Sequence, residues 1–326
     1  MAQVVRRTIG ERDYYYLQHT IREGGRPEKK ERYLGTSLPK NVEELSEKFL
    51  HDLYLPRWEG KLERIREGYL EETHRIPKSA GEKNLEIFSI TFTYNTQRIE
   101  GSTLTLRETA ELLEHGVTPS GKPLRDVKEA EAHQQVFYDM LAYARELTLG
   151  EVLFWHRKLF LPTRPDIAGK IRDHQVRISG SKFLPPTPVE ISPLLEDFFQ
   201  WLRRKTHEYN PVELAALAHL KFVTIHPFTD GNGRISRLML NHVLMRRGYP
   251  LFVVPYKGRA SYYRALESAQ TRKEPMRFVR WLIKRYIEVY RRFLEDKWER
   301  PPGTGSGESL RSLRRTRSSP GNQGSV

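Results

Sequence analysis

Apolar residues are densest in two stretches on either side of position 230. The first stretch covers 211–225 and the second covers 235–245, and both are apolar on nearly every side, which is typical of buried helices. Asn210 and Glu213 have the spacing of a capping box at the start of the first stretch, and Gly248 follows the second as a helix stop. The pattern therefore predicts two buried helices joined by a polar loop.

Residues 1–40 follow a different pattern. Short runs rich in β-branched and aromatic residues cover 4–9, 14–21 and 31–34, with glycine-containing turns between them, which predicts a small antiparallel sheet of three strands. Basic residues alternate with tyrosines here, so a nucleic-acid-binding regulator that uses this sheet stays open as an alternative. Acidic residues interrupt the basic ones and favour the simpler interpretation, a solvated basic face over a tyrosine-rich core.

The remaining chain is mainly α-helical by its apolar spacing, so we expect a mainly α fold with a small β appendage at the N-terminus. We expect a helical linker region over 41–84, broken near Pro56, followed by one helical domain over 85–298. The last helix of that domain is expected over 276–298. From 299 to 326 the composition turns to Pro, Gly, Ser and Arg, which predicts a disordered basic tail.

One segment, 175–190, interrupts the helical pattern. Val176 and Ile178 lead into Gly180 and then into the pair Pro185-Pro186. This order of residues predicts a β-hairpin on the helical body, and an exposed hairpin edge can bind an extended peptide through main-chain hydrogen bonds. An ordinary connecting loop is the equally open alternative.

The charge of the chain favours acidic partners, because Lys+Arg number 55 against 41 Asp+Glu and the net charge is +14. The chain has no cysteine, which excludes disulfides, thiolate nucleophiles and Cys-ligated zinc. No apolar run has the length of a membrane span, and the N-terminus lacks the apolar region of a signal peptide. We therefore expect a cytoplasmic protein with no membrane partner.

The polar loop and the helix after it, 226–237, have the composition of an anion site. A helix N-terminus offers free N–H groups and a positive dipole end. Gly231 and Gly233 allow the backbone to approach a phosphate closely. Arg234 and Arg237 are one turn apart and are expected to face the same polyphosphate.

Two further side chains of this segment indicate what is done to the anion. Asp230 offers the hard oxygen ligand that a phosphate-bound Mg²⁺ prefers. His226 offers a base that is mostly neutral at pH 7. A base, a metal ligand, a phosphate site and two guanidiniums together indicate phosphoryl or nucleotidyl transfer.

The segment 226–237 resembles the signature of the Fic-domain family, His-Pro-Phe-x-Asp/Glu-Gly-Asn-Gly-Arg-x-x-Arg, and matches it at every specified position. The resemblance covers roughly 85–285. It implies a helical Fic fold with a β-hairpin flap and an adenylyltransferase that moves AMP from ATP to a Ser, Thr or Tyr hydroxyl of a protein, with Mg²⁺ (or Mn²⁺). His226 would be the catalytic base and Asp230 the metal ligand; the nucleotide would be bound by Gly231, Asn232, Gly233, Arg234 and Arg237.

The resemblance also assigns residues outside the signature. A tyrosine pair and an amide surround the adenine in this family, and Tyr262, Tyr263 and Gln270 stand at these positions, although Asn is common where Gln270 stands. The flap that positions the target protein corresponds to Val176, Arg177, Ile178, Ser179 and Gly180.

A second family motif lies upstream, near 95–101. Thr96, Glu100 and Gly101 fit the Ser/Thr-x-x-x-Glu-Gly/Asn pattern of the inhibitory helix of the Fic family. In related proteins this glutamate pairs with the second arginine of the signature, here Arg237, and keeps the γ-phosphate of ATP from its productive position. The resemblance therefore implies self-inhibition by an inhibitory helix that lies N-terminal to the Fic core.

Several alternatives stay open at this stage. Removal of AMP from proteins would use the same site, with Glu100 orienting a water molecule. A kinase-like relative carries Lys where Gly233 stands, which argues against phosphate transfer. The partners to consider are ATP, a target protein of unknown identity, the chain itself as a target, a second copy in a homodimer, and nucleic acid bound by 1–40.

Overall fold

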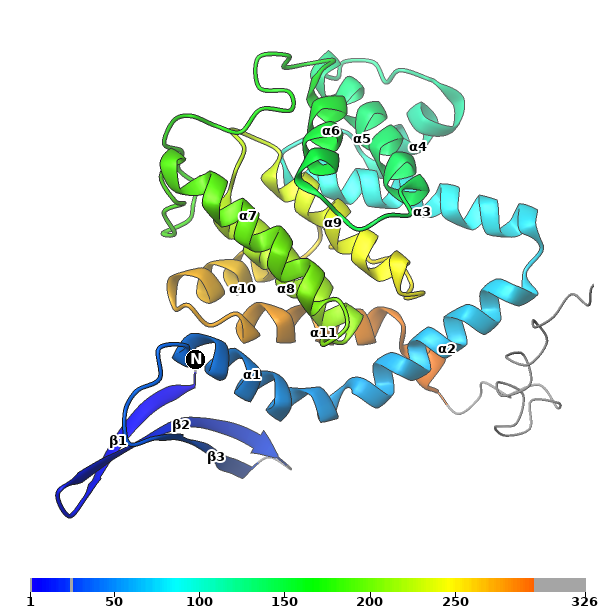
Figure 1. Cartoon of the computed structure of the whole chain (residues 1–326). Helices are drawn as coiled ribbons and strands as arrows, with labels where there is room; N and C mark the ends of the chain where they lie inside the picture. Colours follow the sequence, from blue (N-terminus) through cyan, green and yellow to red (C-terminus); the bar gives the residue numbers. More distant parts are fainter. Residues whose placement is uncertain (1, 24–25, 296–326) are drawn as a thin grey trace, which may run out of the picture.

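The computed structural model describes residues 2–23 and 26–295. At its N-terminal end, β1 (Gln3–Ile9), β2 (Arg12–Glu23) and β3 (Arg26–Gly35) form an antiparallel sheet in the order β1-β2-β3, which confirms the predicted sheet. In Figure 1 this sheet lies at one end of the molecule, beside α1. Leu17 and Ile21 of β2 are buried, and His19 lies 3.0 Å from the Tyr54 hydroxyl, so one face of the sheet packs on α1.

The chain then forms a long arm below the helical body, drawn in blue in Figure 1. It consists of α1 (Val42–Tyr54), a 3₁₀ turn (η1, Leu55–Arg57) and α2 (Glu59–Arg75). This 3₁₀ turn confirms the predicted break near Pro56. The break occurs because proline lacks the N–H that a continuous helix would need. Phe49, Leu50, Leu62 and Ile65 of this arm are buried in the same apolar core as the body.

The body is a bundle of helices around a central pair. That pair is α8 (Pro211–Ile225) and α9 (Asn232–Arg246), and most side chains of both helices are buried, as their apolar pattern predicted. Figure 1 shows the other helices around this pair. They are α3 (Lys78–Ile99), α4 (Leu106–His115), α5 (Leu124–Ala142), α6 (Leu149–Phe160), α7 (Pro188–Lys205), α10 (Arg259–Thr271) and α11 (Met276–Val289), with a final 3₁₀ turn, η2 (Arg291–Leu294).

No helix within 2–23 and 26–295 has the length and apolar character that crossing a membrane requires. The last helix is shorter than the predicted 276–298, because α11 ends at Val289 and a 3₁₀ turn follows. The predicted tail, 299–326, lies outside the described residues.

The capping box predicted at α8 is only half formed. Asn210 accepts a hydrogen bond from the N–H of Val212 (3.0 Å), as expected. Glu213, however, does not return to the Asn210 backbone; its carboxylate is fully buried and contacts Nδ1 of His51 at 2.8 Å. A long-range ion pair has replaced the local cap, and it ties α1 to the start of α8.

The β-hairpin expected over 175–190 is wrong in one respect: the segment turns back on itself without forming paired strands. A turn is present, because the N–H of Ser181 donates to the carbonyl of Ile178 (3.1 Å). The two arms are instead joined by side chains, since Gln175 donates to the carbonyl of Pro185 (3.0 Å) and Arg172 to that of Pro186 (2.6 Å). Prolines on the returning arm have no N–H to offer, so a regular ladder cannot form there.

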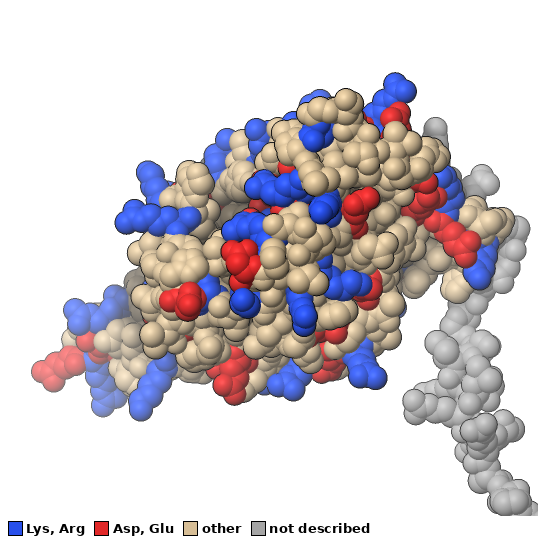
Figure 2. Space-filling view, turned by 90° about the horizontal axis from the view of Figure 1, so that it is seen from above, with Lys and Arg blue, Asp and Glu red and all other residues tan. Residues whose placement is uncertain are grey.

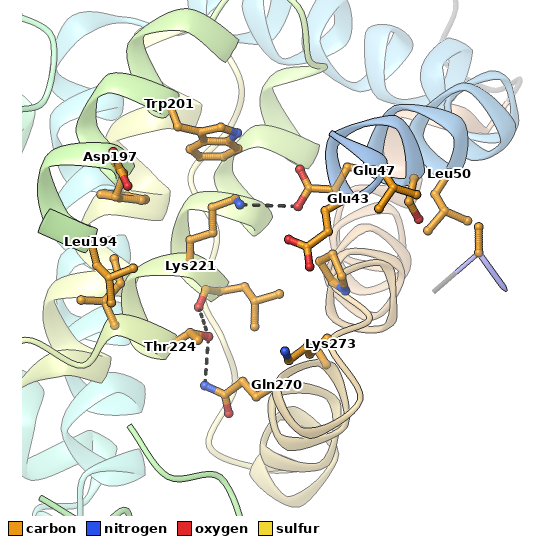
Figure 3. Close-up of a pocket in the computed structure, with 18 of the residues that line it drawn as sticks. Glu43, Glu47, Leu50, Leu194, Asp197, Trp201, Lys221, Thr224, Gln270 and Lys273 are labelled. Carbon is orange, nitrogen blue, oxygen red and sulfur yellow. Dashed lines mark hydrogen bonds and ion pairs between the residues drawn. The ribbon is translucent and has the colours of Figure 1, made fainter. Parts of the chain in front are cut away.

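A cavity of about 750 Å³ lies between the arm, the sheet and the body. In Figure 3, Leu50 from α1, Trp201 from α7 and Lys221 from α8 lie around it, and Lys221 forms an ion pair with Glu47 of α1 (3.5 Å), which also lines it. Gln270 of α10 also lines it. None of residues 226–237 lines this cavity, so it is described apart from the site below.

Candidate functional site

The loop between α8 and α9 is held in shape by its own backbone and by one amide side chain. His226 ends α8 in a left-handed conformation (φ 52°), and Gly231 precedes α9 with φ 85°. Asn232 is buried, and its side chain accepts from the N–H of Phe228 (2.9 Å) and donates to the carbonyl of the same residue (2.8 Å). The Asn232 amide therefore braces the loop, and only the backbone of this residue is left to meet an anion.

Gly231 is required at its position for two reasons. Its positive φ is costly for residues with a side chain, and an added Cβ would overlap the ring of Phe160 on α6. Gly233 has a different constraint, because an added Cβ would overlap the carboxylate of Glu100. The two glycines thus bring the start of α9 close to α6 on one side and to the end of α3 on the other.

His226 is oriented as a base. Its Nδ1 lies 3.2 Å from the carbonyl oxygen of Val223, and since a carbonyl only accepts, Nδ1 carries the proton and Nε2 has the free lone pair. Burial is the main cause that lowers the pKa of His226 below its usual value. The imidazole is therefore neutral at pH 7 and ready to accept a proton at Nε2.

Arg234 is a fixed part of the site. Its side chain is 3% exposed and lies over the Phe160 ring, 4.5 Å from the ring centre. It donates to Asp230 Oδ1 (2.9 Å) and to Glu129 of α5. The guanidinium is thus held between two carboxylates, and Nη1 also lies 3.5 Å from Gln97 Oε1 at the end of α3.

Arg237 contacts the end of α3. Its Nη2 lies 2.5 Å from Glu100 Oε1 and 3.4 Å from the Thr96 carbonyl, and its Nη1 lies 3.4 Å from the Tyr262 hydroxyl. The Tyr262 hydroxyl in turn lies 3.1 Å from Nε2 of the buried His219. Arg237 is 1% exposed and Glu100 is 25% exposed, so the pair is reached by solvent from the Glu100 side only.

Glu100 caps the C-terminus of α3, and Gly101 follows with φ 99°. The glycine allows the chain to turn sharply, and the N–H of Ser102 returns to the carbonyl of Gln97 (3.0 Å). This turn holds Glu100 against the first turn of α9, at Gly233. The structure therefore brings the Thr96 carbonyl and the Glu100 carboxylate into contact with Arg237.

Asp230 lies at the mouth of the loop with both carboxylate oxygens engaged. Oδ1 accepts from the Gly231 N–H (2.5 Å) and from Arg234, while Oδ2 accepts from Arg164 Nη1 (2.7 Å). Burial alone would raise the pKa of Asp230, but the charge of Arg234 and these hydrogen bonds outweigh it and lower the pKa. Asp230 is ionised at neutral pH.

The donor set around Asp230 fits Mg²⁺ held together with a nucleotide. Within the described part of the chain no three His, Asp or Glu side chains gather as a metal cluster. Mg²⁺ is commonly held by one or two carboxylates together with substrate phosphates and water, and the Asp230 side chain is 35% exposed. Asp230 could therefore supply the protein ligand, and phosphates and water the others.

The predicted adenine-binding residues lie in three different environments. Tyr262 is 2% exposed, and its hydroxyl contacts Arg237 and His219. Tyr263 is 45% exposed and donates its hydroxyl hydrogen to the carbonyl of Ile99 (3.0 Å). Gln270 donates to Thr224 (3.2 Å) at the cavity of Figure 3, so of the three only Tyr263 presents a large exposed ring beside the end of α3.

Arg172 joins the flap to the signature loop, and the sequence pattern did not identify it. It is 3% exposed and donates through its guanidinium to the carbonyls of His226 (2.8 Å), His174 (2.8 Å) and Pro186 (2.6 Å). On the far side of the flap, the N–H of Lys182 donates to Glu267 of α10 (2.7 Å). The flap residues 176–180 are thus held between the two anchors.

Other residues that the sequence did not identify lie behind Asp230. His156 Nε2 donates to the Asp230 carbonyl (3.0 Å) and its Nδ1 accepts from the Gly169 N–H (2.9 Å), while burial lowers its pKa to about 4. Arg164 and Glu129 contribute the ion pairs described above. None of these residues belongs to a local motif, and a single sequence contains no signal that connects them to the loop.

Comparisons with known proteins find similar chains. A model of the Fic/DOC family matches residues 146–244. The protein adenylyltransferase fic-1 of Caenorhabditis briggsae is 36% identical over 209 residues, which are 62% of this chain and 41% of that protein. The protein adenylyltransferase Fic of Drosophila ananassae is 37% identical over 180 residues, or 54% of this chain and 36% of that protein. The chain therefore spans less than half the length of these curated relatives.

Solved structures are similar over a larger share. A fragment of Fic-1 from C. elegans is 30% identical, with a TM-score of 0.64 over 78% of this chain and 77% of that chain. A Fic domain containing signaling protein from Bacteroides thetaiotaomicron is 26% identical, with a TM-score of 0.65 over 71% and 95% of the two chains. The fold is thus shared with both over most of this chain.

Proposed function

Because the chain belongs to the Fic/DOC family, we propose that it is a protein adenylyltransferase that transfers AMP from ATP to a Ser, Thr or Tyr hydroxyl of a target protein. The observation that carries this proposal is the orientation of neutral His226, whose Nε2 is left to accept a proton in the same short loop that leads into the N-terminus of α9. That N-terminus offers an anion site next to a base. The relatives named protein adenylyltransferase support the choice of the adenylyl group.

The reaction needs one proton transfer and one displacement at phosphorus. The target hydroxyl oxygen attacks the α-phosphorus of ATP, its proton passes to Nε2 of His226, and the bond from the α-phosphorus to the bridging oxygen breaks. Pyrophosphate leaves with the electron pair of that bond. The contribution of the protein is positioning and electrostatic stabilisation.

The chain divides these tasks between loop and helix. The backbone N–H groups at 232–234, in the first turn of α9, would face the phosphates, and the Asn232 side chain keeps the loop in its shape. Arg237 would neutralise charge on the departing pyrophosphate. Mg²⁺ (or Mn²⁺), when held by Asp230, supplies further positive charge to the phosphates.

Inhibition by Glu100 is part of the same proposal. Arg237 cannot bind a phosphate and Glu100 at the same time, because the carboxylate occupies Nη2 at 2.5 Å. The carboxylate also lies at the first turn of α9, where it would repel an incoming γ-phosphate. Release of Glu100 would therefore be needed before ATP adopts the productive position.

Removal of AMP from a modified protein is the second candidate. It is favoured by one observation: Glu100 is 25% exposed next to the anion site, so its carboxylate could orient a water molecule towards an AMP phosphate. The two reactions make opposite predictions for Glu100→Gln. If the chain transfers AMP under restraint by Glu100, this variant should label proteins faster than wild type. If the chain removes AMP with the help of Glu100, this variant should remove AMP more slowly than wild type.

Intact-mass spectrometry tests the proposal most directly. The purified chain, alone or mixed with a cell lysate, is incubated with Mg²⁺ and one of the four nucleotides ATP, GTP, CTP and UTP. The protein masses are then compared between the four nucleotides. Because Glu100 restrains transfer, we expect a gain of one AMP from ATP with the Glu100→Gly chain, a smaller gain with wild type, and none when His226→Ala is added to either. A gain of one phosphate only, or equal gains in the His226→Ala variant, would contradict the proposed reaction.

A further inference from the structure

Two arginines from different parts of the chain share the carboxylate of Asp230. Arg234, on α9, occupies Oδ1 at 2.9 Å, and Arg164, in the turn after α6, occupies Oδ2 at 2.7 Å. These oxygens are the ones that the proposed function assigns to Mg²⁺. The question is which arginine stays when the metal–nucleotide complex binds.

Arg234 cannot leave. Its guanidinium is 3% exposed, pairs with Glu129 as well as Asp230, and lies 4.5 Å from the centre of the Phe160 ring. Moving it would leave Glu129, itself 8% exposed at its side chain, without its charge partner in the interior, and that is costly. Oδ1 of Asp230 therefore remains occupied by Arg234 in any state of the site.

Arg164 has the opposite properties. Its side chain is 32% exposed, and Asp230 is its one carboxylate partner among the residues that the structure describes. Its guanidinium lies 6.0 Å from the centre of the Phe160 ring. If Arg164 moves into solvent, it loses this loose ring contact and one ion pair whose partners are 32% and 35% exposed, and such exposed pairs are weak.

A cation that reaches Asp230 from solvent therefore meets Arg164 at Oδ2. A guanidinium and a divalent cation repel each other at the distance of a shared carboxylate, so the two exclude each other. We propose that Arg164 is a positioning residue that occupies Oδ2 of Asp230 in the nucleotide-free protein and competes with the divalent cation for it. This inference rests on the proposed function, because that function places the metal at Asp230.

The experiment measures nucleotide binding and needs no transfer reaction. The dissociation constant of ADP, which lacks the γ-phosphate, is determined by calorimetry with the full chain, once in Mg²⁺ and once in EDTA. The variants are Arg164→Gln, Arg164→Lys and, as the matched control, Arg157→Gln. Arg157 is an exposed arginine on α6, so its replacement removes the same charge without touching Asp230.

Competition predicts a specific pattern. Arg164→Gln should bind ADP about two- to fivefold more tightly than wild type in Mg²⁺, the effect of losing one partly exposed ion pair, with less than a twofold change in EDTA. Arg164→Lys retains a charge that can compete and should stay near wild type. Arg157→Gln should match wild type in both conditions.

Three results would overturn the inference. Equal affinities of wild type and Arg164→Gln in Mg²⁺ would mean that Arg164 does not oppose the metal. Weaker binding of Arg164→Gln in both conditions would mean that Arg164 contacts the phosphates instead. A chain that binds no nucleotide in either condition would overturn the proposed function together with this inference, whereas the first two results leave the proposed function in place.

Discussion

Replacing Glu100 with glycine should raise the rate of the proposed AMP transfer. The change removes the carboxylate that lies 2.5 Å from Arg237 Nη2 and leaves every residue of the signature loop in place. Arg237 keeps its contacts with the Tyr262 hydroxyl and the Thr96 carbonyl, so its guanidinium should remain near its present position. It is then free to bind a phosphate.

The size of the effect follows from the competition between carboxylate and phosphate. Two opposite charges about 4 Å apart attract by about 4 kcal/mol at an effective dielectric constant of about 20. Solvent reaches the pair from the Glu100 side, where the side chain is 25% exposed, and this screening reduces the net advantage to about 2–3 kcal/mol. That corresponds to an increase in transfer rate of about 30- to 150-fold.

The assay compares labelling by radioactive ATP in wild type, Glu100→Gly, Glu100→Gln and the double variant Glu100→Gly with Arg237→Ala. Glu100→Gln tests charge, because it keeps a side chain of the same length. Glu82→Gly, at an exposed position near the other end of α3, controls for loss of helix stability. Automodification of the chain serves as the readout before a target protein is known.

The double variant should fall back to wild-type labelling or below, because the freed arginine is the group that the gain depends on. Equal labelling by wild type and Glu100→Gly would refute the reasoning. So would a gain that survives in the double variant, since the charge of Arg237 would then have no part in it.

Three other predictions follow from contacts in and around the site. Burial lowers the pKa of His226, and the neutral form of the imidazole is the base. As pH is lowered, kcat/KM for transfer should therefore stay high to pH 6.5 and fall only below it. A fall in kcat/KM centred above pH 6.5 would argue against His226 as the base. Gly231→Ala should lower the melting temperature and prevent nucleotide binding, since the new Cβ meets the Phe160 ring at a positive φ; calorimetry should show both losses, whereas unchanged binding would mean that the loop can move. His51→Ala should lower the free energy of unfolding by about 3–5 kcal/mol, because it leaves the buried carboxylate of Glu213 without its charge partner. A urea titration measures this loss, and the same titration of His74→Ala, at an exposed position, should show little change.

The His51 prediction has a defined pH dependence. Burial favours neutral His51, but the hydrogen bond and charge of Glu213 outweigh burial and raise the pKa of His51 above its usual 6.5. A raised pKa in the folded state means that the stabilisation is complete below pH 6.5 and is lost as pH rises through the higher value. The stability of wild type should therefore decline above pH 6.5 relative to His51→Ala, and parallel pH profiles would show that the pair does not depend on the His51 charge.

The sequence by itself determined the elements that depend on local pattern. The buried pair α8 and α9 follows from apolar residues on nearly every side, and the three strands follow from β-branched and aromatic runs between glycine turns. The signature loop was also identifiable, because the residues that shape it and that would bind an anion lie next to one another along the chain. Glu100 was identified as the partner of Arg237 because a second short motif could be read together with the first.

Only the tertiary structure decided which charges meet. Arg164 and Asp230 are 66 residues apart, Arg234 and Glu129 are 105 apart, and His51 and Glu213 are 162 apart. An ion pair has no periodicity along the chain, so its partners become known only when packing brings the helices together. The same reason explains why two local predictions were wrong. Glu213 pairs with the distant His51 instead of capping α8, and the flap arms are joined by Arg172 and Gln175 instead of by paired strands.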